Sequence, residues 1–139
     1  MYEYRKMTPE QKAAVVAERI ARGYPWHAPP HFAEGVNTYV LTAACFEHQE
    51  ILTTSSRLDE FTEALVRGIE QQVNGKLYAW VVLPNHYHLL AELDLATFRG
   101  WIGRLHNGKS TQWNREDGTP GRKVWYRFSD RKIRNDRHF

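Results

Sequence analysis

The fold of this chain is decided by the stretch Leu77–Leu93, which reads LYAWVVLPNHYHLLAEL. The run before Pro84-Asn85 is rich in Val, Tyr and Trp, which favour strands, and it is apolar on both faces. The run after it, His86–Leu93, also has the composition of a strand. Because Pro84-Asn85 has turn chemistry, the stretch predicts two antiparallel strands joined by a tight turn.

The second of these strands separates two kinds of side chain. Alternate residues of a strand share a face, so one face carries an apolar set, made of Tyr87, Leu89, Ala91 and Leu93. The other face carries a mixed polar set that suits a cleft, made of His86, His88, Leu90 and Glu92. The two imidazoles therefore stand side by side, about 7 Å apart at the backbone, and can reach one metal ion.

Three interpretations of the histidine pair stay open from the residues alone. In the first, His86 and His88 are structural histidines, hydrogen-bonded within a partly buried strand. In the second, they bind a divalent metal that needs at least one more ligand. Imidazole alone suits zinc or copper, whereas phosphate oxygens in the shell would suit magnesium or manganese. In the third, they act as acid and base on a phosphodiester, although side-by-side rings serve that reaction poorly.

The segment before the hairpin contains a strand and a helix. Val36–Phe46 is rich in β-forming residues and predicts the first strand. Ser55 or Ser56 can cap the helix that follows, whose apolar residues recur at helical spacing. Asn74-Gly75 is a strong stop and turn signal, so we expect this helix to end there.

The segment after the hairpin contains a second helix and a fourth strand. Asp94 can cap the helix, which fades near Trp113, and Val124–Phe128 has the composition of a short strand. The complete order is β-α-β-β-α-β. It matches an α+β, ferredoxin-like sandwich, in which two helices cover one face of an antiparallel sheet and the other face is open.

A helical extension precedes this domain. Thr8 and Gln11 can form a capping box around Pro9, and the apolar run that follows ends at Gly23. The prolines of residues 24–31 exclude a helix or a central strand there, so we expect an ordered aromatic connector. We therefore predict residues 1–35 as a helix and connector, and residues 36–139 as the ferredoxin-like domain.

The composition limits the class of protein. The chain has 139 residues and a mass of 16.3 kDa, enough for one domain with a core. Its single cysteine, Cys45, excludes an internal disulfide and a thiolate zinc cluster. No apolar run approaches the roughly 20 residues that span a bilayer, and the N-terminus lacks a signal-peptide core. We therefore expect a cytoplasmic protein with no membrane partner.

Charge is distributed unevenly along the chain. Residues 1–93 hold 8 Lys and Arg against 11 Asp and Glu, whereas residues 94–139 hold 11 against 5. This asymmetry predicts a polyanionic partner for the C-terminal part, although a solvated basic face is the simpler alternative. The residues predicted to contact phosphates are Arg104, His106, Lys109, Arg115, Arg122, Arg127, Arg131 and Arg134, with Arg99, Lys123, Lys132 and Arg137 as further candidates. The aromatic residues that could stack on unpaired bases are Trp113, Trp125, Tyr126 and Phe128.

Several segments resemble one family of DNA enzymes. Leu83–Leu90, LPNHYHLL, resembles the signature that carries the paired histidines of IS200-type single-strand transposases with an HUH motif. The REP-associated tyrosine transposase branch is the closer match, because further segments resemble it in residues 25–31, 42–44, 105–106 and 124–139. The ordered set spans nearly the whole chain from Arg22 onward.

The resemblance implies a ferredoxin-like enzyme that acts on single-stranded DNA. In this family the two motif histidines, here His86 and His88, hold a Mg2+ or Mn2+ ion that polarises a backbone phosphate. A tyrosine on a helix after the last strand attacks that phosphate, which gives a 5′-phosphotyrosine link and a free 3′-hydroxyl. Covalent capture divides the reaction into two easier steps, and the metal neutralises the developing charge.

The chain departs from the family at the nucleophile. The family's tyrosine segment has no match before Phe139, and the third metal ligand is expected on the same helix. We therefore expect a copy truncated before that helix, a nucleophilic tyrosine beyond Phe139, and no covalent intermediate from the chain as given. Tyr126 is a weaker candidate nucleophile, because it falls in a strand motif of the family.

Several functions stay open at this point. The leading one is a transposase or nickase-type domain that acts on single-stranded or hairpin DNA. The second is a DNA-hairpin binding module without chemistry. A metal-dependent phosphodiesterase outside this family, or a core with structural histidines, is the third. Whether the chain is an enzyme stays open, as does whether it forms a homodimer.

Overall fold

The computed structural model of the chain describes residues 7–21 and 35–133. The chain divides into two compact units, Met1–Phe32 and Ala33–Phe139, which are described separately. The first contains the helix α2 (Pro9–Ala21). Its capping box is as predicted: the Thr8 N–H donates to Gln11 Oε1 at 2.9 Å, and the Gln11 N–H donates to Thr8 Oγ1 at 3.3 Å. The predicted stop at Gly23 and the connector of residues 24–31 lie outside the described residues.

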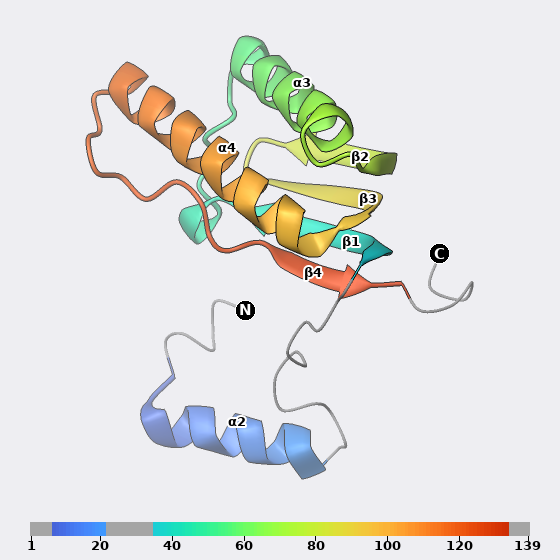
Figure 1. The fold of residues 1–139 in the computed structure, drawn as a ribbon. Helices are drawn as coiled ribbons and strands as arrows, with labels where there is room; N and C mark the ends of the chain where they lie inside the picture. The colour runs from blue at the N-terminus through green and yellow to red at the C-terminus, as the bar shows by residue number, and fades with distance from the viewer. Residues whose placement is uncertain (1–6, 22–34, 134–139) are drawn as a thin grey trace. The chain divides into compact units, whose positions relative to one another are not determined.

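The second unit contains a four-stranded antiparallel sheet with helices on one face (Figure 1). In chain order its elements are β1 (Val36–Ala44), the short 3-10 helix η1 (Phe46–His48), α3 (Ser55–Gln71), β2 (Lys76–Leu83), β3 (His86–Asp94), α4 (Leu95–Glu116) and β4 (Ser129–Lys132). The strand order is β2-β3-β1-β4, so β3 and β1 are central and β2 and β4 are edges. This is the α+β, ferredoxin-like arrangement that the sequence predicts. No helix within residues 7–21 and 35–133 combines the length and the hydrophobicity that a membrane span needs.

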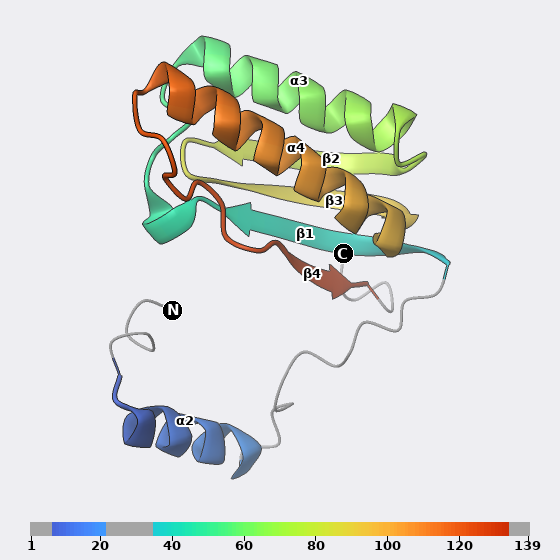
Figure 2. The ribbon, with the colours of Figure 1, turned by 60° about the vertical axis from the view of Figure 1, so that its left-hand side comes forward.

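Both long helices lie on the same face of the sheet. Figures 1 and 2 show α3 and α4 side by side over the strands in two views. The apolar set of β3 faces them and is almost fully buried, as predicted for Tyr87, Leu89, Ala91 and Leu93. Within residues 35–133 no helix covers the other face, which we call the open face.

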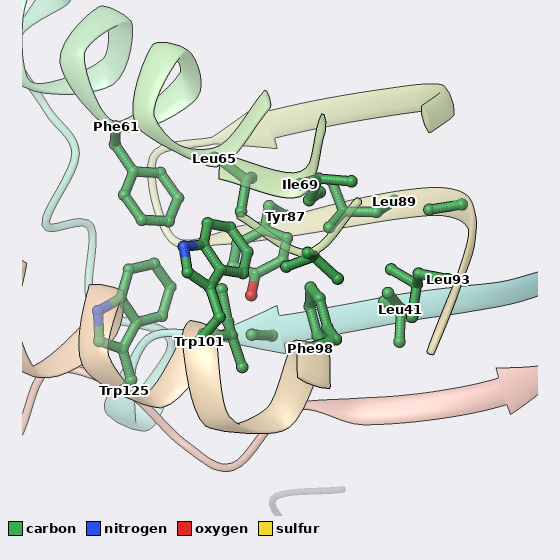
Figure 3. Close-up of a cluster of buried hydrophobic side chains, with 14 of the residues drawn as sticks. Leu41, Phe61, Leu65, Ile69, Tyr87, Leu89, Leu93, Phe98, Trp101 and Trp125 are labelled. Carbon is green, nitrogen blue, oxygen red and sulfur yellow. The ribbon is translucent and has the colours of Figure 1, made fainter. Parts of the chain in front are cut away.

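An aromatic cluster fills the core between the helices and the sheet (Figure 3). The ring centre of Phe61 on α3 lies 5.2 Å from that of Trp125, 5.7 Å from that of Tyr87 and 5.8 Å from that of Trp113. These rings come from α3, β3, α4 and the segment before β4, so one cluster joins four parts of the chain. Packing of this kind fixes the position of β3, and with it the residues on its other face.

Capping side chains set the start of both long helices. Thr54 caps α3, because its Oγ1 accepts from the Arg57 N–H at 3.2 Å. The prediction of Ser55 or Ser56 is wrong, since neighbouring hydroxyl residues offer the same chemistry and tertiary packing selects between them. Asp94 caps α4 as predicted, because its Oδ1 accepts from the Thr97 N–H at 2.8 Å. That bond lowers the pKa of Asp94.

The predicted fourth strand, Val124–Phe128, is wrong. These residues are irregular apart from one bridge between Cys45 and Trp125, and β4 is Ser129–Lys132. Val124 and Trp125 are buried because they fill the core beneath the helices. Their apolar character therefore reflects burial and not strand pairing, while the polar composition of β4 suits an edge strand.

Candidate metal and nucleic-acid site

The turn between β2 and β3 fixes the backbone from which the histidine pair starts. The Pro84 carbonyl accepts from the Ile51 N–H at 3.0 Å and from the Leu52 N–H at 2.9 Å. The Asn85 carbonyl accepts from the Cys45 N–H at 2.8 Å. These bonds tie the turn to the segment that joins β1 to α3. A site whose backbone is held in this way keeps its geometry better than a free hairpin would.

His86 and His88 project from the open face of the sheet. Their ring centres are 5.0 Å apart, and the ring planes cross at 77°. His88 is exposed and His86 is half-buried, so neither is enclosed beneath the helices. Two rings at this separation can present a nitrogen each to one ion, which is the arrangement that the alternation of β3 predicts.

Hydrogen bonds within the protein fix the orientation of each ring. Asn85 Nδ2 donates to the His48 carbonyl at 3.2 Å, which turns Asn85 Oδ1 toward His86 Nδ1 at 2.6 Å. An amide oxygen only accepts, so His86 Nδ1 carries the proton and Nε2 keeps its lone pair. Thr42 Oγ1 lies 2.7 Å from His88 Nδ1 and holds the second ring by the same nitrogen. Oxygen partners of this kind orient metal-binding histidines.

The surroundings of His86 favour its neutral form. Burial lowers the pKa of His86, and the imidazoles of His88 and His48 lower it further. A metal binds the neutral imidazole, so this shift keeps the ring available as a ligand near neutral pH. The sequence prediction missed His48 and the role of Thr42, because both are brought to the pair by tertiary contacts and not by local spacing.

The two histidines could supply two nitrogen ligands to an ion. Over residues 7–21 and 35–133, no group of three or more His, Cys, Asp and Glu side chains could hold a metal ion. A divalent ion bound at this pair would need water or phosphate oxygens in its other positions. Mg2+ and Mn2+ accept such oxygen ligands readily.

A cation and two aromatic rings lie beside the pair. Lys123 Nζ lies 4.6 Å from the ring centre of Phe46 and 5.4 Å from that of Tyr126. The Tyr126 N–H donates to the Ala44 carbonyl at 2.9 Å, and Ala44 pairs with His86 across β1 and β3. This group, which we call the Lys123 cluster (Phe46, Lys123 and Tyr126), therefore lies at the same end of the sheet as His86.

Arg131 on β4 lies on the same face of the sheet as the histidines. It pairs with Val40, whose partner on β3 is Leu90 of the open face. Arg127 is exposed in the segment before β4, and Arg134 lies outside the described residues. Positive charge near the pair therefore comes from β4 and the segment that leads into it.

The predicted phosphate-contacting residues of α4 lie in the helix layer, on the opposite face of the sheet from the histidines. Arg104 and Arg115 are exposed there. Lys109 forms an ion pair with Glu60 at 3.6 Å. Arg122, in the loop after α4, forms one with Asp117 at 2.7 Å. The structure therefore divides the predicted basic surface into two parts, and only one of them shares a face with the histidine pair.

His106 is a core residue, which corrects its assignment to the DNA-contacting set. It is 8% exposed, its ring stacks on Trp125 at 4.3 Å, and its Nε2 lies 3.1 Å from the Tyr87 hydroxyl. Burial lowers the pKa of His106 to about 3, so the ring is neutral. Trp113 and Trp125 are buried as well, and Phe128 packs on the core, so these rings are not exposed for base stacking.

Four tyrosines lie in the described part of the chain. Tyr39 and Tyr87 are buried, and the Tyr78 hydroxyl donates to Glu92 at 2.9 Å. Tyr126 is half-buried, with its ring centre 4.9 Å from that of Phe46. None of these four residues lies on a helix, so the described residues hold no tyrosine in the position of the family's nucleophile.

Comparison with known proteins finds solved structures with a similar fold. No protein-family model and no curated protein sequence matches the chain. A REP-associated tyrosine transposase, solved with a REP hairpin bound, covers 81% of this chain at a TM-score of 0.53 and 21% identity. A candidate transposase from Deinococcus radiodurans R1 covers 81% of the chain at a TM-score of 0.54 and 16% identity. The chain shares its fold with these transposases.

The comparisons differ in how much of each neighbour this chain matches. The match covers 64% of the REP-associated transposase, so this chain corresponds to less than two thirds of that protein. It covers 90% of the Deinococcus protein. The structural neighbours are therefore of the kind that the sequence resembles, and the ferredoxin-like prediction is confirmed. At these identities the shared property is the fold, so the roles of single residues rest on the geometry described above.

Proposed function

We propose that this chain binds single-stranded or hairpin DNA and holds one backbone phosphate at His86 and His88 through Mg2+ or Mn2+. The observation that carries the proposal is the ring pair on the open face, in which an oxygen partner at each Nδ1 leaves Nε2 as the nitrogen that an ion could bind. Arg131 on the same face of the sheet and Lys123 at the same end of the sheet would attract a phosphate backbone. The hairpin bound to one structural neighbour supports DNA as the partner.

The protein's part in this chemistry would be to orient the metal ligands. When bound, the ion would withdraw charge from a non-bridging phosphate oxygen. Asn85 and Thr42 hold the two imidazoles in place, which reduces the cost of ordering them when the ion enters. Because the described residues supply two nitrogen ligands, phosphate oxygens would complete the shell. We therefore expect metal and DNA to bind cooperatively.

The reaction class that we propose for this site is transfer of a DNA strand through a phosphotyrosine. A tyrosine oxygen would attack phosphorus, the bond to the 3′ oxygen would break, and a free 3′-hydroxyl would leave. The new ester keeps the phosphodiester's energy for rejoining. The described residues would supply phosphate and metal binding, and the nucleophile would lie outside them. A DNA-hairpin binding module without chemistry is the second candidate, favoured by the absence of a helical tyrosine among the described residues.

Metal-dependent binding tests the first part of the proposal. Affinity for a hairpin with a single-stranded flank would be measured by fluorescence anisotropy during a Mn2+ titration. We expect affinity to rise with Mn2+ in the wild type and to be indifferent to Mn2+ in His86→Ala and His88→Ala. Arg104→Ala, in the helix layer, is the control that should keep the Mn2+ response. A normal response in both histidine variants would overturn the proposal.

Incubation of the chain with the same DNA and Mn2+, followed by denaturing electrophoresis, tests the nucleophile. We expect no covalent adduct. An adduct that disappears in Tyr126→Phe would instead identify Tyr126 as the attacking residue. An adduct that survives in Tyr126→Phe would place the nucleophile elsewhere in this chain.

A further inference from the structure

The edge strand β2 carries a strip of exposed apolar side chains, part of which lies next to the histidine pair. Among the described residues, four of the five exposed large hydrophobic side chains lie on β2, namely Tyr78, Trp80, Val81 and Leu83. Edge strands usually carry charge that discourages pairing with other chains. On β2 the only charged residue is Lys76, at its start. The strip is therefore a surface that needs an explanation.

The register of the sheet places two of these side chains beside the imidazoles. Val81 pairs with His88, and Leu83 pairs with His86. Residues that pair directly share a face, with Cβ atoms about 4.5–5.5 Å apart. Val81 is 43% exposed and Leu83 is 37% exposed. A ligand held at the imidazoles would therefore also lie against Val81 and Leu83.

The surroundings of the pair are charged on its other sides. The Lys123 cluster and Arg131 lie toward β1 and β4 and would attract a phosphate backbone. Glu92, at the far end of β3, lies on the open face and would repel it. Phosphates are thus favoured over β1 and β4. The β2 side, which has no charge near the pair, is left for the uncharged part of a nucleotide.

We propose that Val81 and Leu83 form a seat for the unpaired base next to the phosphate held at His86 and His88. This inference rests on the proposed function. Every base has an apolar face that can pack on exposed side chains without regard to sequence. A base within a duplex is already stacked and paired, so the seat selects a single-stranded nucleotide. The two sides of the open face would then bind different parts of a nucleotide, with the phosphates over β1 and β4 and the base over β2.

A pair of variants on β2 tests the seat. The double variant Val81→Thr/Leu83→Thr places β-branched Thr, which suits a strand, at both positions and removes much of the apolar surface. We expect it to bind single-stranded hairpin DNA about tenfold more weakly, by the same factor at low and high salt, because no counterion is released at an uncharged contact. Trp80→Thr is the matched control, since Trp80 pairs with the core residue Leu89 and lies on the opposite face. Unchanged affinity in the folded double variant would overturn the seat.

A second measurement needs no substitution in the protein. Each base of the single-stranded flank is removed in turn, leaving its phosphate, and the dissociation constant is measured for the wild type. We expect one abasic position to weaken binding about tenfold, and the double variant to show no further loss at that position. A scan without a sensitive position would overturn the seat, even if the double variant did not fold.

The outcomes separate this inference from the proposed function. If His86→Ala loses Mn2+-dependent binding while the β2 double variant binds normally, the seat is wrong and the proposed function stands. If His86→Ala and His88→Ala both keep that binding, the proposed function itself is wrong. A wild-type dimer in sedimentation that becomes monomeric in the double variant would assign the strip to a second copy of this chain and overturn the seat.

Discussion

The imidazoles on the two sides of β3 lie in opposite environments. His106 packs against the helix-covered face, where it stacks on Trp125 and contacts the Tyr87 hydroxyl. His86 lies on the open face, where its Nδ1 is hydrogen-bonded to Asn85 Oδ1 and its Nε2 could bind a ligand. Burial lowers the pKa of both, yet only one of them can meet a ligand. The covering of a face, and not the residue type, therefore decides which imidazole can bind a ligand.

The largest expected effect is on the covered face. Phe61→Ala should lower the free energy of unfolding by about 3–5 kcal/mol, because it leaves a cavity at the centre of the aromatic cluster. His86→Ala, on the open face, should change it by less than about 1 kcal/mol. Urea unfolding followed by circular dichroism measures both. Equal losses would show that the open-face histidine is structural, and the contrast between the faces would fail.

The second prediction concerns how the free energy of unfolding depends on pH. The pKa of His106 is about 3 in the folded protein against 6.5 for an ordinary imidazole, so the unfolded chain binds more protons between these values. Stability is therefore fully present above pH 6.5 and falls as pH drops toward 3, by up to about 1.4 kcal/mol per pH unit from this group.

The variant His106→Gln isolates this contribution, because it has no titrating ring at that position. Its unfolding free energy, measured by urea between pH 7 and pH 4, should fall less steeply than that of the wild type. Other acid-sensitive groups, such as Asp117, are common to both proteins and cancel in the comparison. Parallel curves would mean that His106 is not kept neutral by the core.

A third prediction addresses the support of the open-face rings. Thr42→Val removes the oxygen next to His88 Nδ1 and keeps the shape of the side chain. We expect the Mn2+ affinity of the DNA complex to weaken by about 10–100-fold. Thr38→Val is the control, because Thr38 lies on the same strand and face but pairs with Glu92. A Mn2+ titration in which both variants behave alike would remove Thr42 from the site.

The smallest expected effect separates the two groups of cations. Arg131→Ala should reduce the slope of log affinity against log salt concentration by about 0.7–0.9, as expected for one lost phosphate contact on a single strand or a duplex. Arg104→Ala should leave the slope unchanged, because Arg104 lies in the helix layer. Binding to hairpin DNA at several salt concentrations gives both slopes. Equal reductions would show that α4 also contacts DNA.

Local signals in the sequence were sufficient for the framework of the fold. The turn at Pro84-Asn85, the cap at Asp94 and the alternation along β3 all lie where they were predicted. Each depends on residues within a few positions of one another, so a short window contains the whole signal. The prediction of a strand at Val124–Phe128 was wrong for the same reason. A short apolar run looks the same in the sequence whether it pairs as a strand or fills a core.

The sequence by itself determined that His86 and His88 share one face of a strand, because side-chain alternation is a property of a single extended segment. Only the tertiary structure decided that helices cover the other face, that β2 is an exposed edge, and that His106 is buried. It also brought Thr42 and His48 to the pair. The physical reason is that strand order and helix packing join residues far apart in the chain, and no local pattern specifies which element covers a face.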